Sequence, residues 1–445
     1  MEVPTLTPRN RFSSLMDQSL PESHATVPVP EGAGAWRKFL AFAGPGLMVA
    51  VGYMDPGNWA TDIAGGARFG YTLLSVILIS NLFAMILQHL AVKLGIATGR
   101  DLAQACRDQF SRPVGLTLWV LAEIAIAATD VAEVLGSALA LNLLFGLPLT
   151  LGVLVTILDV FVILWFQNRG FRVLESIVGG LIAVILVCFV YQMIVSHPSL
   201  PAVAQNLLPK PEIVTNPSML YVAIGILGAT VMPHNLYLHS SIVQTRSYSR
   251  TSAGKKEAIK FATLDSTLSL FLAFFINSAI LIVAAAAFHT SGNHDVADIT
   301  DAHRLLDPIL GVKLASVSFA VALLAAGQNS TLTGTLAGQI VMEGFLNLRL
   351  KPWVRRLLTR SIAVIPAFFA TLWYGEKGTS ELLVFSQVVL SVQLSFAVIP
   401  LVWFTSRSDI MGRFVNAAWL RLASWAIAAV ILVLNVYLIY SSVDL

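Results

Sequence analysis

Long apolar runs separated by short polar segments make up most of this 445-residue chain. A helix that crosses the roughly 30 Å hydrocarbon core of a bilayer needs about 20 consecutive apolar residues. Eleven runs meet that requirement, so the pattern predicts an all-α integral membrane protein with eleven transmembrane helices. The predicted spans are 38–66, 72–96, 114–145, 147–167, 173–195, 218–245, 264–288, 309–346, 354–375, 380–405 and 416–441.

The first and sixth spans are each interrupted by polar residues and a proline. The interruptions are residues 52–58 (GYMDPGN) and residues 230–235 (TVMPHN). A proline has no N–H to donate to the carbonyl four residues earlier, so Pro56 and Pro233 deprive the carbonyls of Gly52 and Ala229 of their helical partners. Such free backbone groups are tolerated at membrane depth where they face protein, water or an ion. We therefore expect both helices to be broken inside the membrane.

The positions of the two breaks indicate an internal repeat. Spans one to five and six to ten form two five-helix halves, about 38–195 and about 218–405, with an extra helix at about 416–441. An odd number of spans in each half forces the halves into opposite orientations. Interrupted helices at corresponding positions of two halves are the best sequence indication of a transporter's binding site at the membrane midplane.

The segment before the first span has a different composition. Residues 1–35 are polar and proline-rich, with too little apolar surface to form a core, and they are expected to be a disordered cytoplasmic tail. Residues 36–445 are expected to form a single transmembrane domain. Cys106 and Cys188 are the two cysteines of the chain, and they provide no disulfide framework.

Composition and charge agree with the membrane assignment and predict its orientation. Only 12% of the residues are charged, against about 25% in soluble domains. Of the 28 Lys and Arg residues, all but Arg68, Lys210, Arg304, Lys313 and Lys377 fall in segments on the side of the amino terminus. The positive-inside rule therefore predicts an amino terminus inside and a carboxyl terminus outside. The one-sided basic loops give no reason to expect a nucleic-acid partner, and the lipid bilayer is the expected surrounding.

The two breaks offer a set of groups that could bind a cation. They are the Asp55 carboxylate, the Asn58 amide, the Met232 thioether and the carbonyls of Gly52 and Ala229. Oxygen ligands alone suit Mg²⁺, Ca²⁺, Mn²⁺ or Na⁺, whereas a sulfur ligand shifts the preference toward Mn²⁺, Fe²⁺, Co²⁺ or Cd²⁺. Packing is an alternative role for Met232. Asn58 could cap the following half-helix, a role that does not exclude metal binding.

Several motifs in the right order resemble those of the Nramp divalent-metal transporters. They are residues 55–58 (DPGN), 232–235 (MPHN), 327–339 (GQNSTLTGTLAGQ) and 385–391 (FSQVVLS). The resemblance covers about residues 36–440 and implies a LeuT-type fold and proton-coupled import of Mn²⁺ or Fe²⁺, with no cofactor and no obligate protein partner.

The resemblance also assigns roles to individual residues. It implies a metal site built from Asp55, Asn58, Met232 and the Ala229 carbonyl, with the carbonyl of Gly52 and the side chain of Gln387 as further ligands. Ser395 departs from the family pattern, which usually has proline there, and this leaves the bending of span ten open.

Ionisable residues in span three suggest a proton pathway. Glu123, Asp130 and Glu133 are spaced by seven and three residues, which places them near one helical face. His234 can titrate near neutral pH, and Arg360 could pair with these acids or extend to the lipid headgroups. A polar seam between helices is the alternative for the acids. The family resemblance favours a route through Asp130, Glu133 and His234 over one through Arg360.

The loop between spans seven and eight carries several acidic and histidine residues. It could collect metal ions at the mouth of the pathway, although a solvated, weakly helical loop is the simpler interpretation. The residues concerned are His289, His294, Asp295, Asp298, Asp301, His303 and Asp307.

Three other functions compete with metal symport. A sodium-coupled organic-solute symporter, such as an amino-acid transporter, could use the same architecture, and a cation channel could use the same ligands. An intramembrane metalloenzyme is disfavoured because the chain has no HExxH or equivalent motif, so the protein is not expected to be an enzyme. The expected location is a bacterial cytoplasmic membrane.

Overall fold

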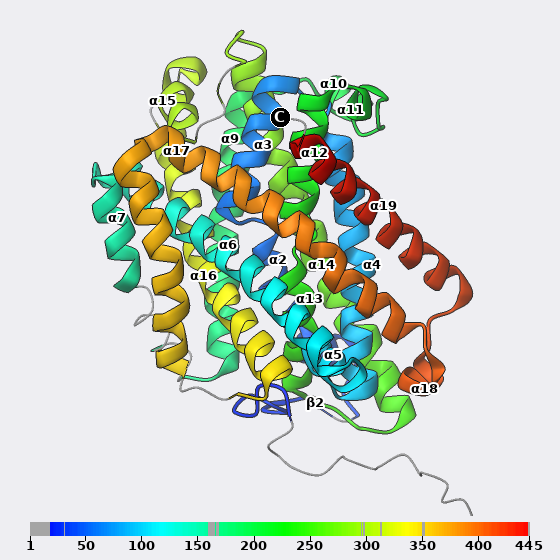
Figure 1. Cartoon of the computed structure of the whole chain (residues 1–445). Coiled ribbons are helices and arrows are strands. Elements are labelled where there is room, and N and C mark those ends of the chain that lie inside the picture. The colour runs from blue at the N-terminus through cyan, green and yellow to red at the C-terminus, as the bar shows by residue number, and fades with distance from the viewer. Residues whose placement is uncertain are drawn as a thin grey trace, which may run out of the picture.

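The computed structural model describes residues 18–30, 32–158, 165, 169–294, 296, 299–311, 314–348 and 352–443. Within these ranges the chain is a bundle of tilted helices with one two-stranded parallel sheet, formed by β1 (Val27–Pro28) and β2 (Arg246–Ser247). Figure 1 shows β2 at one end of the bundle and the short connecting helices α10 (Leu200–Gln205) and α11 (Glu212–Thr215) at the other.

The first predicted repeat is present, with its first span broken as expected. Seven of the described helical stretches are long and apolar enough to cross a bilayer. The elements up to the end of this repeat are α1 (Ala35–Phe42), α2 (Pro45–Gly52), α3 (Pro56–Phe69), α4 (Leu74–Thr98), α5 (Leu102–Gln109), α6 (Arg112–Phe145), α7 (Leu149–Val155), η2 (Thr156–Leu158) and α9 (Phe171–Ser196). The remainder of the fourth predicted span falls on residues 159–164 and 166–168, which lie outside the described residues.

The second repeat mirrors this organisation and adds a final helix. Its elements are α12 (Pro217–Thr230), α13 (Pro233–Ile242), η3 (Val243–Thr245), α14 (Ser252–Ala284), η4 (Ala285–His289), α15 (Ile299–Leu310), α16 (Ala315–Leu346), α17 (Pro352–Thr405), α18 (Ser408–Met411), η5 (Gly412–Phe414) and α19 (Ala418–Val443). Among the described residues, each predicted span other than the fourth is helical over most of its length, as predicted. The predicted start of span eight at residue 309 is wrong, because Pro308–Leu310 belong to α15, a separate amphipathic helix outside the span.

One continuous helix in this list is two spans. Gly375 inside α17 has φ 61° and ψ −142°, a conformation that breaks the helix and that side-chain-bearing residues rarely adopt. Spans nine and ten therefore meet at Gly375, and Figure 1 shows α17 turning back at the end of the bundle where α15 lies. Beyond the turn, Ser395 continues the helix, and Asn435 of α19 donates to its hydroxyl at 3.1 Å.

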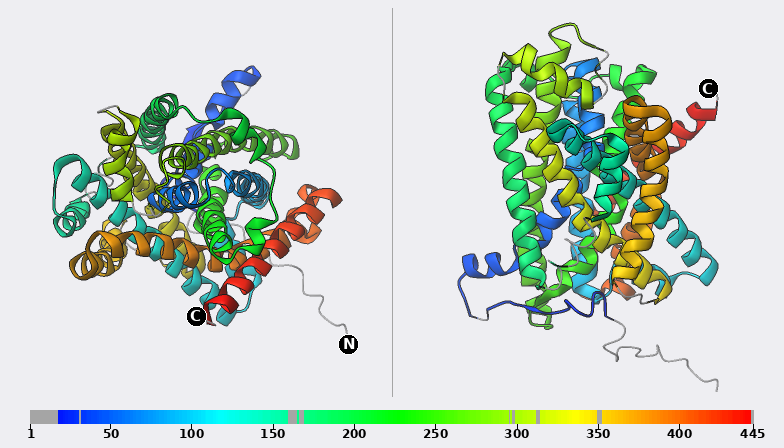
Figure 2. Two further views of the ribbon diagram at one scale, coloured as in Figure 1. Left: turned by 90° about the horizontal axis from the view of Figure 1, so that it is seen from above. Right: turned by 90° about the vertical axis from the view of Figure 1, so that its left-hand side faces the viewer.

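The second half of α6, from Ala125 to Ala140, is largely buried inside the bundle. This helix lies against α16 and α17, while α14 covers α2, α3 and α4. Viewed along the bundle in Figure 2, α3 and α12 lie among the other helices while α19 lies at the edge. The broken spans are accordingly almost fully buried, whereas Trp419, Leu422 and Val433 of α19 expose more than half of their surface, as expected for side chains that face lipid.

The expectation of a disordered tail is wrong for residues 18–30. Leu20 and Val27 are each 4% exposed, and β1 pairs with β2 in parallel register. Burial of two apolar side chains and a row of backbone hydrogen bonds offset the conformational entropy lost when this polar segment is ordered. The rest of the bundle provides the apolar surface and the backbone partners for these contacts. Residues 1–17 and 31 lie outside the described part of the chain.

We expect Gly136→Ala to disturb the first break through a steric clash. A Cβ at Gly136 of α6 would lie 2.2 Å from two carbons of the Pro56 ring, and such overpacking costs about 1–3 kcal/mol. Gly180→Ala on α9 is the matched control, because a Cβ there meets nothing within 4 Å. Thermal melting of the two variants measures the effect. Equal behaviour of the pair would contradict tight packing of α6 on Pro56.

Candidate metal site

At the first break, one carboxylate oxygen of Asp55 has no hydrogen-bond partner. Asp55 is the N-cap of α3, where its Oδ1 accepts the backbone N–H of Asn58 at 2.8 Å. Its second oxygen, Oδ2, is buried without a hydrogen-bond partner, and so is the side-chain oxygen Oδ1 of Asn58. A buried carboxylate oxygen without a partner is costly, so the break is suited to a cation or a proton.

The same backbone bond shows which residue caps α3. The backbone N–H of Asn58 receives the cap from Asp55, while its side-chain oxygen remains available. Capping of α3 is therefore carried out by Asp55, and the Asn58 amide is free to act as a ligand.

The second break has the same architecture. α12 ends at Thr230, and α13 begins at Pro233 with Met232 as its N-cap residue. Met232 is completely buried, as is Ala229. Since Pro233 has no N–H, the Ala229 carbonyl lacks its ordinary helical donor, as Gly52 does opposite Pro56.

Close contacts bring the two breaks together with α17. A Cβ at Gly57 would lie 1.8 Å from Nε2 of Gln387, and one at Gly228 would lie 2.6 Å from the Gln387 carbonyl. Gln387 therefore packs against both broken helices, and its Oε1 is buried without a partner. A third contact joins the breaks directly, because a Cβ at Gly52 would lie 2.2 Å from Nδ2 of Asn235.

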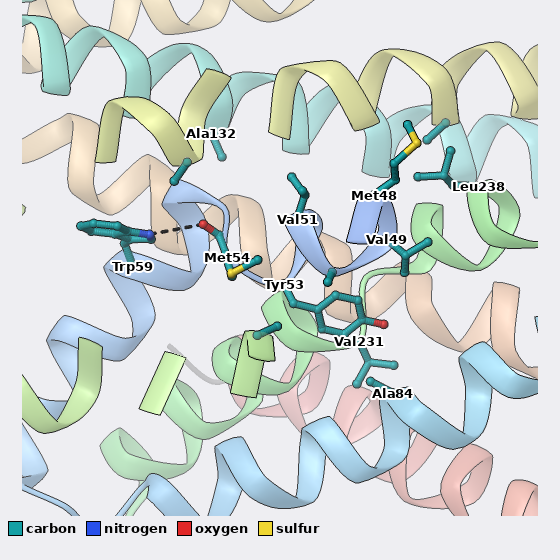
Figure 3. Packing of buried hydrophobic residues seen from close by; sticks show 14 of the residues in the cluster. Met48, Val49, Val51, Tyr53, Met54, Trp59, Ala84, Ala132, Val231 and Leu238 are labelled. Carbon is teal, nitrogen blue, oxygen red and sulfur yellow. Dashed lines mark hydrogen bonds between the residues drawn. The ribbon is translucent and has the colours of Figure 1, made fainter. Parts of the chain in front are cut away.

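Apolar packing holds the first break in place. Figure 3 shows the indole of Trp59 donating to the Met54 carbonyl, a bond of 3.3 Å, and the Tyr53 ring beside Val231 of the second break. Trp59 also packs edge-on against Phe189 and Phe319, with ring centroids 4.9 and 5.1 Å apart. The side chain of Asn277 donates to the Tyr53 carbonyl at 2.6 Å. The backbone carbonyls of Tyr53 and Met54 are therefore occupied.

The acidic residues of α6 diverge in their surroundings. Glu133 is fully buried, accepts the Ser330 hydroxyl at 2.7 Å and lies 3.8 Å from Nη1 of Arg360. Asp130 is 6% exposed. Glu123 is partly exposed and accepts the indole N–H of Trp119 at 3.0 Å, one turn earlier on its own helix.

The structure thus decides between the two roles considered for Arg360. Its side chain is 5% exposed and pairs with Glu133, so it does not extend to the headgroups. The pair lies near the first break, because Gly136, which meets Pro56, is one turn along α6 from Glu133. His234 is 3% exposed, with Nδ1 at 3.5 Å from the hydroxyl of Thr129, the residue beside Asp130.

A buried charged cluster closes the end of α2 on the amino-terminal side. Arg246 is fully buried, binds Glu175 at 2.6 Å and donates to the carbonyl of Ala43 at 2.8 Å. Asp265 of α14 accepts the backbone N–H of Gly46 at 2.6 Å. The first turn of α2 is therefore tied to α9, to β2 and to α14.

The loop between spans seven and eight is only partly described. The ring of His294 packs on that of His289, with their Nδ1 atoms 3.2 Å apart, and His289 contacts the Ala67 carbonyl at 3.0 Å. Asp295 and Asp298 lie outside the described residues. In the described part, α15 is an ordered helix whose Ile299 and Leu306 are buried, so this part of the loop is more structured than expected.

Sequence reasoning missed two buried polar residues beside the breaks. Asn235 has both side-chain polar atoms unpartnered, and Asp62 of α3 has an unpartnered Oδ2 at 1% exposure. The signal for Asp62 was a carboxylate two turns after Asp55 inside an apolar span, which is itself an indication of function. The contact of Asn235 with Gly52 joins segments about 180 residues apart and gave no local signal.

Comparison with known proteins identifies the family. Residues 46–441 match the model of the Nramp family, described as natural resistance-associated macrophage protein-like. A divalent metal cation transporter MntH of Listeria welshimeri is 64% identical over 425 residues, which cover 96% of this chain and 95% of that protein.

Solved structures agree with this result. A crystal structure of a variant of the Eremococcus coleocola manganese transporter superposes with a TM-score of 0.89 at 43% identity, covering 95% of this chain and 91% of that one. A nucleobase-cation-symport-1 family transporter, at 17% identity and a TM-score of 0.60, covers 92% of this chain and 90% of that one, and shares the fold alone. The chain is therefore an integral membrane protein with a LeuT-type fold, and it belongs to the Nramp family.

Proposed function

We propose that this protein transports divalent transition-metal ions, Mn²⁺ foremost with Fe²⁺, Co²⁺ and Cd²⁺ as further substrates, into the cytoplasm together with protons. The ligands are Asp55, Asn58, Met232 and the Ala229 carbonyl, with the Gly52 carbonyl and Gln387 completing the shell. The two halves of the fold rock about this site to give alternating access. The membrane is a bacterial cytoplasmic membrane, with the amino terminus inside.

One observation carries the proposal. Three side-chain oxygens are buried without partners: Oδ2 of Asp55 and Oδ1 of Asn58 at the first break, and Oε1 of Gln387, a residue that packs against both broken helices. Native proteins rarely leave such atoms unsatisfied, and a divalent cation would satisfy all three. The buried thioether of Met232 at the second break adds the soft ligand that favours a transition metal over Mg²⁺ or Ca²⁺.

The geometry disfavours an organic-solute symporter. Such a transporter uses the free N–H groups of a half-helix to bind the carboxylate of its substrate. In this protein the carboxylate of Asp55 already accepts an N–H at the start of α3, that of Asn58. The relatives described above are named as metal transporters rather than enzymes.

Proteoliposome uptake with a pH-sensitive dye inside tests the proposal. Mn²⁺ added outside is expected to enter saturably and to acidify the interior, whereas Mg²⁺ and Ca²⁺ enter poorly. Amino acids in excess are expected to leave Mn²⁺ uptake unchanged. Sodium-dependent uptake that amino acids inhibit would favour the rival symporter, and uptake that never saturates would favour a channel.

Protons are proposed to leave the site through α6. A carboxylate that ligates a metal must be ionised, so a proton held on Asp55 is released when the ion binds. We propose that it passes to Asp130 and the cytoplasm, in a seam that includes Glu133, His234 and Arg360. The supporting observations are the Thr129–His234 contact beside Asp130 and the Glu133–Arg360 pair near Pro56. Glu123 is the remaining candidate of this pathway.

Asp130→Asn is expected to abolish dye acidification during Mn²⁺ uptake while Mn²⁺ binding persists, because the amide keeps the shape but cannot carry the proton. Thr117→Val is the matched control on α6, since its exposed hydroxyl binds only the Pro113 carbonyl of its own helix. Glu123→Gln, tested in parallel, decides whether Glu123 belongs to the route. Undiminished acidification by Asp130→Asn would exclude the proposed pathway.

A further inference from the structure

Residues 18–30, here called the amino-terminal strap, lie across one end of the bundle. Figure 1 shows the strap in dark blue beside β2, opposite the end that carries α10 and α11. The side view in Figure 2 shows it running beneath the ends of the spans. This end is the one expected to face the cytoplasm.

One anchor of the strap is polar and buried. Ser19 is 5% exposed, and its hydroxyl donates to the carboxylate of Asp101 and lies 2.6 Å from the hydroxyl of Ser241. Asp101 also caps α5 by accepting the Gln104 N–H at 2.8 Å. Ser19 therefore joins the start of α5 to the end of α13, the half-helix that begins at Met232.

The second anchor is a short row of backbone bonds. The N–H of Ala25 donates to the Gln244 carbonyl at 3.0 Å, and that of Val29 donates to the Ser247 carbonyl at 3.2 Å. Between them, β1 pairs with β2, with Val27 opposite Arg246 and Pro28 opposite Ser247. The strap is thus attached to the segment that follows α13.

The paired residue Arg246 connects the strap to the other broken helix. As described above, its guanidinium binds Glu175 and the carbonyl of Ala43 just before α2. The strap therefore connects to the end of α13 directly and to the start of α2 through Arg246. These are the halves of the second and first broken helices that lie on the same side of the bundle as β2 (Figure 1).

The conformation of the strap shows that its contacts hold it in place. Leu20 has φ 46°, a left-handed conformation that is unfavourable for a residue with a side chain. The Leu20 side chain is nonetheless 4% exposed within the main hydrophobic core. A loosely attached segment would relax to an ordinary conformation, so burial of Leu20 and the bonds of Ser19 outweigh this cost.

We propose that the amino-terminal strap is a latch that keeps the cytoplasmic side of the metal site closed. Opening toward the cytoplasm requires the inner halves of the broken helices to separate from their neighbours, and the strap holds α13, α5 and β2 together. It must therefore leave β2 once in every transport cycle. This inference rests on the proposed alternating-access function.

A disulfide between strap and β2 tests the latch. Pro28→Cys and Ser247→Cys, in a background with Cys106→Ser and Cys188→Ser, place two cysteines at paired positions of adjacent strands, within the Cα separation that a disulfide bridges. Oxidation is expected to stop Mn²⁺ uptake into proteoliposomes, and a reductant is expected to restore it. Mn²⁺ binding in detergent is expected to persist in the oxidised form.

A disulfide inside the strap is the matched control. Ser23→Cys with Thr26→Cys bridges a turn closed by the Thr26 N–H and the Ser23 carbonyl at 3.3 Å, and oxidation there is expected to leave uptake unchanged. Full uptake by the oxidised Pro28→Cys/Ser247→Cys protein would overturn the latch but leave the transport function intact. Absence of uptake in the reduced and unmodified proteins would instead overturn the proposed function. Failure to form the disulfide would contradict the strand register on which the latch depends.

Proteolysis gives a second measurement that does not depend on transport. Glu22 is an exposed residue of the strap, and a glutamyl endopeptidase cleaves after it when the strap detaches. Ser19→Ala removes the contacts with Asp101 and Ser241, so it is expected to accelerate cleavage at Glu22 severalfold. Cleavage at Glu212, on α11 at the opposite end, serves as the internal control. An unchanged rate at Glu22 would show that Ser19 does not hold the strap.

Discussion

Asp55→Asn is expected to abolish Mn²⁺ uptake and to weaken Mn²⁺ binding by more than about a hundredfold. Removing one partner of a buried charge pair costs about 3–5 kcal/mol, and each 1.4 kcal/mol is about tenfold in affinity. Asparagine is as good an N-cap as aspartate, so the bond from the Asn58 N–H and the start of α3 are retained. The substitution therefore removes the negative charge and little else.

Calorimetric titration of the purified variant and radiotracer uptake measure this loss. Asp108→Asn, at an exposed carboxylate on α5, controls for a general change of charge. Asp62→Asn is an informative comparison, since Asp62 is an equally buried carboxylate on the same helix, two turns away. If Asp55→Asn bound Mn²⁺ as tightly as the unmodified protein, the site would have to lie elsewhere.

Met232→Leu is expected to raise Ca²⁺ uptake relative to Mn²⁺ uptake by about tenfold or more. The thioether favours Mn²⁺ over Ca²⁺, and losing a preference of about 1.4 kcal/mol in binding free energy changes the ratio of the two affinities about tenfold. Leucine conserves the buried volume, and such exchanges usually cost less than about 1.5 kcal/mol of stability. The thioether is thereby removed without opening a cavity. Competition between the two ions in the same liposomes reports the ratio directly.

Met54→Leu provides a closely matched control for the sulfur. Met54 is 1% exposed and immediately precedes Asp55, yet Figure 3 shows it packed among apolar side chains beside Trp59. Both variants lose one buried thioether next to a break. If only Met232→Leu changes the ratio of Ca²⁺ to Mn²⁺ uptake, the effect comes from loss of a metal ligand and not from altered packing. An equal effect of the two substitutions would mean that Met232 only packs.

Some of the candidate ligands can be predicted from neighbouring residues in the sequence, and others cannot. Asp55 and Met232 could be identified because each adjoins a proline inside an apolar span, and hydropathy and the missing N–H of proline are properties of a few consecutive residues. Gln387 was identified only through resemblance to a family. Its contact with Gly57 and Gly228 depends on how α17 crosses two other helices, and no residue near 387 encodes that crossing.

Local sequence pattern predicts the eleven spans, the two breaks and the residues at each break, because burial in a bilayer imposes length and polarity rules on each segment separately. Tertiary structure alone decided which side chains meet. It paired Arg360 with Glu133, Asn235 with Gly52 and the strap with β2. These are contacts between segments far apart in sequence, and their free energy comes from the complementary packing of whole helices. The strap shows the difference most clearly, since its composition predicted disorder and only the surface beneath it supplied the partners that order it.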